Sequence, residues 1–335
     1  MAKFQNMGTF DLNTMQGGSK PFAMDAAGIA SGQAFLTSEL EKRDMLVRTP
    51  LTSFTYTRDI PIRVGGGWAE YVSAMNVGYG ITGGSGDNLI QSASTDGIPL
   101  IQANFGKDLW KTHVISAGTR IFWVDMQRGN VTGRNLDQLL RDGLRMTYDK
   151  HMDENTYVGF SRYGSTGLVN NPDVNVTSAT GNWTSLTPDQ ILADVNTAIL
   201  TAWAAAGYDL DAIPNHIILP YEQYNYIATT KVTQLAEKTI LTFLEENNNN
   251  VATKNGSDLF IGATAWCKGA GTGAVDRMVV YCNKERYIAM DELVPLTRAM
   301  TTPNAERFSY DTAYAGNVSE VEVFYTQPII YVDGI

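Results

Sequence analysis

Residues 135–158, NLDQLLRDGLRMTYDKHMDENTYV, form the longest periodic segment of this sequence. Apolar side chains recur along it every three or four positions, as on one face of a helix: Leu136, Leu139, Leu140, Leu144, Tyr148 and Met152. Asn135, followed three residues later by Gln138, is a weak N-terminal capping signal, and Gly159 marks the end. At about 1.5 Å per residue, such a helix spans roughly 36 Å. We predict a long helix here, seated by its apolar stripe on a sheet of its own subunit.

The segment before this helix, residues 65–118, is rich in glycine and in strand-forming residues. Alternation predicts strands at 68–77, 98–105 and 110–123, and the Gly, Ser, Asp and Asn residues of 78–97 predict a hairpin tip. Such a hairpin is too polar and glycine-rich to hold a core of its own. Five aromatic residues nevertheless lie in it, so we predict that some are buried against another subunit: Trp68, Tyr71, Tyr79, Phe105 and Trp110.

The rest of the chain predicts an α+β fold. Residues 1–33 have no sustained period and read as an extended arm, 35–45 as a short helix and 54–60 as a strand. A second lobe begins near Thr187, where Thr187-Pro188-Asp189-Gln190 is a strong helix start and Gly207 the stop. Buried strands and short helices alternate after it: strands at 216–220, 259–261 and 278–281, helices at 221–230 and 240–246, and a polar loop at 247–250. The late strands of 318–332 are expected to return to the first lobe.

Composition and charge exclude several classes of protein. The chain has 335 residues, 44% of them hydrophobic and 18% charged, with a net charge of -10, which argues against a dedicated nucleic-acid binder. The N-terminus lacks a secretory signal pattern, and no apolar run is long enough to span a membrane. Cys267 and Cys282 are not in a metal-ligand spacing, and we expect both thiols to be reduced and buried.

The search for catalytic or ligand-binding constellations favours structural roles. His113, His151 and His216 have no companion motif, and the pair of His151 and Glu154 lies opposite the apolar stripe, on a solvated or subunit-facing surface. The glycine-rich segments 269–273 and 83–86 lack the Lys-Ser/Thr of a phosphate-binding loop. No Gly-x-Ser-x-Gly elbow and no distinctive pair of carboxylates occurs. We therefore predict no catalytic residue, no cofactor and no metal, and no enzymatic activity.

The order of these parts resembles the major capsid proteins of tailed phages of the Hong Kong 97 type, a fold shared with encapsulin shells. Gly167-Leu168-Val169-Asn170, after the long helix, resembles the Gly-Leu-x-Asn turn of that family. The resemblance covers nearly the whole chain and implies four parts. They are an N-terminal arm with a short helix (1–50), an E-loop hairpin with flanking strands (51–120), a peripheral domain with the spine helix (121–186 and 301–335) and an axial domain (187–300).

The resemblance implies a structural function. Many copies would form hexamers and pentamers that close into an icosahedral head around double-stranded DNA, which is enclosed without sequence-specific binding. The arm follows Met1 almost directly, which implies a separate scaffolding protein; a portal and possibly a decoration protein are the other expected partners, with no membrane. The chain would reside in the virion after assembly in the host bacterial cytoplasm.

One departure from the cross-linking members of that family concerns lysine. Residues 65–106 contain none, and Lys107 and Lys111 lie toward the base of the hairpin. We therefore expect no isopeptide bonds between subunits.

Three alternatives stay open at this point. An encapsulin-like bacterial compartment would share the fold. A secreted adhesin or tail-fibre module would use a similar Asn- and Thr-rich composition in a rod or trimer. An enzyme would need a site assembled from scattered carboxylates.

Overall fold

The computed structural model describes residues 50, 52–82, 100–132, 136–233, 238–253 and 257–335. All the described helices and strands lie within residues 52–335, which form one compact unit. The predicted arm, the short helix at 35–45 and most of the predicted hairpin tip lie outside the described residues. The four domain boundaries that the resemblance implies stay a prediction.

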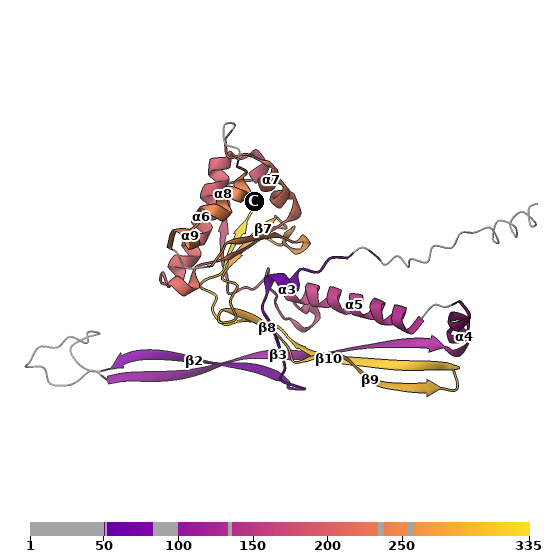
Figure 1. Ribbon diagram of the computed structural model, residues 1–335. Coiled ribbons are helices and arrows are strands. Elements are labelled where there is room, and N and C mark those ends of the chain that lie inside the picture. The colour runs from indigo at the N-terminus through magenta and orange to yellow at the C-terminus, as the bar shows by residue number, and fades with distance from the viewer. Residues whose placement is uncertain (1–49, 51, 83–99, 133–135, 234–237, 254–256) are drawn as a thin grey trace, which may run out of the picture. The chain divides into compact units, whose positions relative to one another are not determined.

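A four-stranded antiparallel sheet carries the hairpin (Figure 1). Its order is β2-β3-β10-β9, with β2 at Tyr71–Thr82, β3 at Leu100–Phe122, β10 at Ser309–Ser319 and β9 at Val294–Asn304. The first half of β3 pairs with β2, from Leu100 to Lys111, and the second half pairs with β10, from Thr112 onward. We call the two paired segments, residues 71–82 of β2 and 100–111 of β3, the β2–β3 ribbon. The strands predicted separately at 98–105 and 110–123 are thus one continuous strand.

Two smaller sheets complete the strand arrangement. One has the order β1-β8-β11, and the other the order β4-β12-β7-β5-β6. Their bounds are β1 Ile62–Val64, β8 Ile288–Glu292, β11 Val321–Val323, β4 Asn175–Ser178, β12 Ile330–Asp333, β7 Arg277–Tyr281, β5 His216–Leu219 and β6 Phe260–Ala263. The strands predicted at 318–332 do not all return to the first lobe as expected: β11 pairs with β8, and β12 pairs with β7 and β4.

The helices confirm most of the predicted elements. The described helices are α3 Tyr56–Asp59, α4 Trp123–Thr132, α5 Leu136–Val158, α6 Pro188–Ala205, α7 Tyr221–Thr229, α8 Ile240–Glu246 and α9 Asn249–Thr253, with single turns η1 Ser161–Tyr163, η2 Trp183–Ser185, η3 Leu210–Ala212 and η4 Ala265–Cys267. The backbone N–H of Thr187 donates to Gln190 Oε1 at 3.0 Å, as the predicted capping box requires, and Gly207 follows the helix at φ 68°. Helix α4 was not predicted, and α9 begins inside the predicted polar loop.

The predicted strand at 54–60 is wrong, because helix α3 occupies this segment. The carboxylate of Asp153, on α5, accepts hydrogen bonds from the backbone N–H groups of Thr55 at 2.8 Å and Tyr56 at 3.1 Å. These donors at a helix start have no partner within the helix, so the distant carboxylate caps α3. The alternating pattern gave no sign of this cap because Asp153 is 98 positions away from Thr55.

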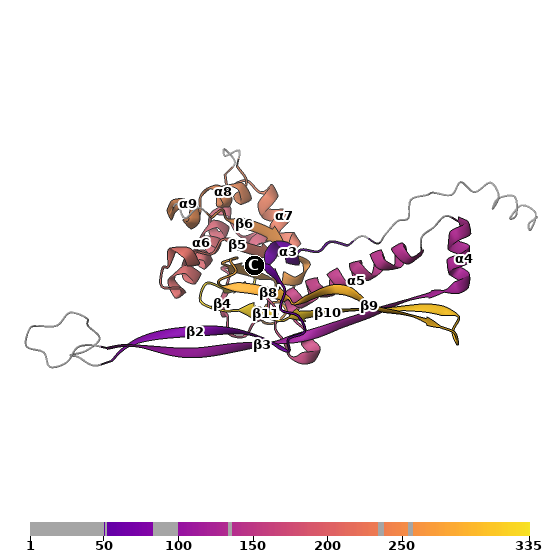
Figure 2. The ribbon, with the colours of Figure 1, turned by 60° about the horizontal axis from the view of Figure 1, so that its bottom comes forward.

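The five-stranded sheet separates two hydrophobic cores. Alternate strand residues point to opposite faces: Ile217 and Val280 join the core that α6, α7 and α8 cover, whereas Ile218 and Val279 join the core against α5. Figures 1 and 2 both show α6, α7 and α8 beside this sheet. The C-terminal half of α5 enters the second core with Tyr148, Met152 and Tyr157.

The apolar stripe of α5 is buried only in its second half. Met152 is 1% exposed, but Leu139 is 43% and Leu140 37% exposed, and Leu144 is half-buried. The bounds of the predicted helix are confirmed, but the prediction that its whole stripe packs on the subunit's own sheet is wrong. The first turns of the helix extend beyond the part of the subunit that covers the stripe.

The Gly167–Asn170 turn closes the C-terminal end of α5. The N–H groups of Leu168 and Val169 donate to the carbonyls of Thr156 (2.9 Å) and Tyr157 (3.0 Å). The Asn170 amide donates to the carbonyl of Val158 at 2.8 Å, and its oxygen accepts from the N–H of Gly167 at 2.7 Å. The turn therefore satisfies three of the carbonyls that a helix end leaves without partners.

Gly167→Ala is expected to destabilise the subunit, because a Cβ at this position would lie 2.4 Å from the carbonyl carbon of Tyr157. Relieving such an overlap moves backbone, so we expect a loss of about 1–3 kcal/mol. Gly143→Ala is the matched control: it lies within α5 and its Cβ meets nothing within 4 Å. We expect it to stabilise by about 0.5–1 kcal/mol. Urea unfolding of both variants as dissociated subunits measures the two effects, and equal stabilities would contradict this account of the turn.

Candidate assembly site

The β2–β3 ribbon exposes large apolar side chains along its length. Tyr79 is 78%, Met75 72% and Phe105 69% exposed. Further exposed apolar residues in or next to the ribbon are Trp68, Tyr71, Val77, Leu100, Ile101 and Leu109. Among the described residues, the two strands of the ribbon pair only with each other, and a two-stranded ribbon is marginally stable alone in water. An exposed apolar surface of this extent is typical of a protein interface.

Trp110 differs from the other aromatic residues predicted to face a neighbour. It is partly buried, and its ring packs edge-on against Phe324 of the same chain at 5.2 Å between centroids. Trp68, Tyr71, Tyr79 and Phe105 are exposed, as burial against another subunit requires. That burial itself stays a prediction.

A second apolar surface lies where α4, the start of α5 and the end of β3 meet. A groove of about 390 Å³ is lined there by Ile121, Phe122, Leu136, Leu139 and Leu140. At its rim Arg120 and Asp311 form an ion pair at 2.7 Å between Nε and Oδ1. The exposed half of the α5 stripe therefore forms one wall of an apolar groove with a charged edge.

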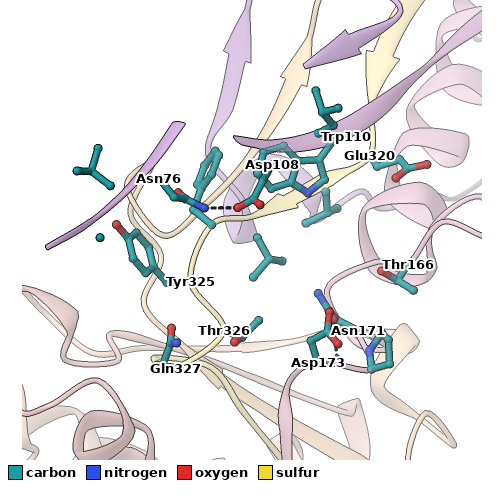
Figure 3. A pocket seen from close by; sticks show the side chains of 17 residues that line it. Asn76, Asp108, Trp110, Thr166, Asn171, Asp173, Glu320, Tyr325, Thr326 and Gln327 are labelled. Atoms are coloured by element: carbon teal, nitrogen blue, oxygen red, sulfur yellow. Dashed lines mark hydrogen bonds between the residues drawn. The ribbon is translucent and has the colours of Figure 1, made fainter. Parts of the chain in front are cut away.

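A larger and more polar groove, of about 820 Å³, lies at the base of the ribbon (Figure 3). Asn76 and Asp108, which are hydrogen-bonded to each other, line it from the ribbon, and Asn171 and Asp173 line it from the segment after the Gly167–Asn170 turn. The polar groups do not converge on one point. Across the described ranges, no three His, Cys, Asp or Glu side chains gather in a metal-binding group.

The most connected polar site is buried in the core, around Asp59 at the end of α3. Its carboxylate accepts two hydrogen bonds from Arg58, at 2.6 and 2.8 Å, and one from Nε2 of His216 at 3.1 Å. The Tyr157 hydroxyl donates to the same carboxylate, and the Tyr281 hydroxyl donates to the backbone carbonyl of Asp59. We call these five residues the Asp59 cluster. They come from α3, α5, β5 and β7. His216 and Tyr281 lie on the same face of the five-stranded sheet as Ile218 and Val279, so the cluster joins that face to α3 and α5.

The protonation states in the Asp59 cluster follow from burial and hydrogen bonding. Burial alone would raise the pKa of Asp59, but the bonds from His216, Arg58 and Tyr157 hold it below its ordinary value. Burial lowers the pKa of His216, and the neighbouring Asp59 opposes this only in part. His216 is therefore neutral near pH 7, and Nε2 carries its proton because Asp59 accepts there. Nδ1 faces the Asn283 amide at 3.5 Å.

The other candidate residues have structural surroundings. His113 Nε2 donates to Glu320 Oε1 at 3.0 Å, and its ring packs against those of Phe160 and Tyr163. His151 and Glu154 are exposed and 3.9 Å apart. Cys267 and Cys282 are free and buried, as predicted.

The glycine-rich segment 269–273 uses its amides within the subunit. The N–H of Gly269 donates to Asp276 at 3.0 Å, and the N–H of Thr272 donates to Asp333 at 2.9 Å. Donors that already bind carboxylates are not available to a phosphate. The segment 83–86 lies outside the described residues. The helices of the described chain include none long and apolar enough to cross a membrane.

Comparisons with known proteins agree on one kind of relative. The family model described as "Major capsid protein" matches residues 86–335. Among solved structures, the capsid of Myoviridae phage XM1 is similar with a TM-score of 0.74 and 17% identity, over 89% of this chain and 98% of that chain. A structure from Microbacterium phage Oxtober96 has a TM-score of 0.62 and 12% identity, over 90% and 98% of the two chains. The capsid of a native GTA particle has a TM-score of 0.59 and 9% identity, over 88% and 94%. None of the curated proteins matches the chain.

The His216 environment predicts a loss of subunit stability at mildly acidic pH. The unfolded chain gains a proton at His216 as the pH falls through about 6.5, whereas the folded chain gains it only at lower pH. The free energy of unfolding therefore decreases as the pH falls below 6.5. The stability that Asp59 contributes is present above its unfolded pKa of 3.8 and is lost as the pH falls through its lower folded value.

His216→Gln keeps a donor for Asp59 and removes the titration, so its melting temperature should change less than that of the wild type between pH 7 and pH 5. All other titrating groups are common to both proteins, and the difference between the two curves isolates His216. Parallel curves in calorimetry of dissociated subunits would show that His216 titrates alike in both states.

Proposed function

The chain belongs to the major capsid protein family, and on that premise we propose that its copies associate through the β2–β3 ribbon into hexamers and pentamers of an icosahedral head. It is a structural protein of the phage capsid, and the predicted fold type is confirmed. The family match does not favour the encapsulin-like or adhesin alternatives. The hexamers and pentamers, and the double-stranded DNA inside the shell, are part of the proposal.

The observation that carries the proposal is the exposure of the ribbon. Single subunits leave Met75, Tyr79 and Phe105 in water on a two-stranded ribbon that has no core. Burial of such side chains stabilises by about 25 cal/mol per Å², so contact with a neighbouring copy both orders the ribbon and holds the shell. Obligate assemblies bury about 2,000 Å² or more at each interface.

The remaining partners follow from the resemblance to the tailed-phage capsid proteins. A separate scaffolding protein, a portal and a decoration protein belong to the proposal, as does assembly in the host cytoplasm before the chain becomes part of the virion. The net charge of -10 suits a DNA container, because a shell that bound phosphates tightly would oppose packaging and ejection. No enzymatic step is part of the proposed role.

We also propose that the shell is held together without covalent bonds. Residues 65–106 contain no lysine, and Lys107 lies opposite Met75, well inside the ribbon. Both cysteines are fully buried, and burial raises the pKa of the Cys282 thiol to about 12. Neither lysine chemistry at the ribbon tip nor disulfides at the surface are then available for cross-links.

Replacing the exposed ribbon aromatics should prevent assembly without unfolding the subunit. In the double variant Tyr79→Ser, Phe105→Ser, we expect an unchanged melting temperature of the free subunit and a loss of shells in electron micrographs. Tyr221→Ser is the control, because Tyr221 is also exposed, at 51%, but lies on α7. Shells from the double variant as abundant and stable as those of the wild type would contradict a role of the ribbon in assembly.

Particles boiled in SDS without reducing agent should release a single band near 36.7 kDa. The physical reason is that burial and hydrogen bonds, unlike isopeptide bonds, do not survive SDS and heat. A ladder of higher bands that persists after reduction would contradict the non-covalent shell. Lys107→Arg and Lys111→Arg would then identify the donor.

A further inference from the structure

The small sheet β1-β8-β11 carries a charge cluster at the base of the ribbon. Arg63 on β1 is in register with Asp291 on β8, and Glu322 on β11 is in register with Ala289, two residues before Asp291. Because side chains alternate across a sheet, Arg63, Asp291 and Glu322 all lie on one face. The guanidinium Nε donates to Asp291 Oδ1 at 2.6 Å, and Nη2 donates to Glu322 Oε2.

One guanidinium thus serves two carboxylates, and one of these is inaccessible to water. The side chain of Glu322 is 0% exposed and that of Asp291 is 16% exposed. Oε1 of Glu322 is buried and has no hydrogen-bond partner among the described residues. With both carboxylates ionised, the cluster has a net charge of -1 and an unsolvated oxygen, an arrangement that costs free energy unless a proton is bound.

The other groups around Glu322 do not supply the missing positive charge. The nearby Ser319 hydroxyl donates to the carbonyl of Glu320. The carboxylates of Glu292 and Glu320, the next ones along these segments, bind the Tyr148 hydroxyl at 2.7 Å and His113 at 3.0 Å. Burial, followed by the charge of Asp291, raises the pKa of Glu322 to about 7, against the opposing effects of the Ser319 hydroxyl and of Arg63.

The cluster lies where the ribbon joins the rest of the subunit. Strand β1 ends at Val64 and is followed by Gly65, Gly66 and Gly67, whose φ angles of 127°, 115° and 71° are in the region that favours glycine. The Arg63 guanidinium also lies over the ring of Phe324, 5.5 Å from its centroid, and the same ring packs against Trp110 of β3. Arg63 therefore lies on the strand that leads into β2 and is linked to β3 indirectly, through the ring of Phe324.

We propose that Arg63, Asp291 and Glu322 form a proton-sensitive latch, in which a proton on Glu322 holds β1 on its sheet and loss of that proton loosens the base of the ribbon. Ionisation of Glu322 adds a buried negative charge beside Asp291, and opening of β1 or β11 relieves it by admitting water. The stabilisation from this proton is fully present below the unfolded pKa of 4.5 and is lost as the pH rises through about 7. This direction is opposite to that of His216, so the two titrations can be told apart.

Hydrogen exchange of dissociated full-length subunits tests the latch. After correction for intrinsic exchange rates, protection of the β1 and β11 amides should fall about tenfold or more between pH 5 and pH 8 in the wild type. Glu322→Gln is isosteric with the protonated residue, and its protection should not fall as the pH rises. Glu246→Gln, at an exposed carboxylate paired with Lys238, is the control and should behave as the wild type.

A second variant keeps the test independent of how Glu322→Gln folds. Asp291→Asn removes the competing carboxylate, so the loss of protection should move to lower pH. The latch would be refuted by an unchanged midpoint in Asp291→Asn, by pH-independent protection in the wild type, or by the same pH dependence in Glu322→Gln. None of these readouts requires shells, so failure of the latch is distinct from failure of the proposed assembly.

Discussion

The buried carboxylate of Asp59 receives hydrogen bonds from α3, α5 and β5, and the rest of the subunit depends on these contacts forming together. An ionised carboxylate without partners is costly in a protein interior, and breaking a buried ion pair by removing one partner costs about 3–5 kcal/mol. That is a large part of a total stability of roughly 5–15 kcal/mol. The cluster thus provides specificity more than net stability: α3 fits against α5 and the five-stranded sheet in one arrangement, because only there are all the bonds to Asp59 made.

The subunit has two closed apolar cores and, apart from them, an exposed apolar surface. The two cores on either side of the five-stranded sheet are closed, with Ile217, Ile218, Val279 and Val280 at 0% exposure. The ribbon and the first half of α5 are open. The subunit therefore folds on closed cores and still exposes a second apolar surface, which the proposed assembly would cover. A fully closed core alone would give a monomer.

Sequence patterns predicted the elements whose signals are local. The capping box at Thr187, the glycine after α6 and the bounds of α5 depend on neighbours within a few residues, and the structure agrees with each. Patterns did not predict α3, because its cap comes from Asp153 on a distant helix. The patterns also gave the wrong burial for Leu139 and Leu140, which line an open groove and not the core. An apolar stripe of helical period arises in both cases, so the period alone does not distinguish a core from an exposed groove. The Asp59 cluster and the charge cluster of Arg63, Asp291 and Glu322 each bring together residues more than a hundred positions apart, and their charged residues carried no spacing signal.

The unbroken course of β3 has a mechanical consequence. One strand belongs to the ribbon over its first half and to the β10 ladder over its second half. Interstrand hydrogen bonds of antiparallel strands lie across the strand direction, so tension along the ribbon is resisted in shear by the whole β3–β10 ladder at once instead of by one bond after another. Any pull that a neighbour exerts on the ribbon is therefore carried along a single covalent strand into the sheet beside α5. The hairpin is thus held to the subunit by many interstrand hydrogen bonds that share the load, and its resistance to pulling increases with the length of the β3–β10 ladder.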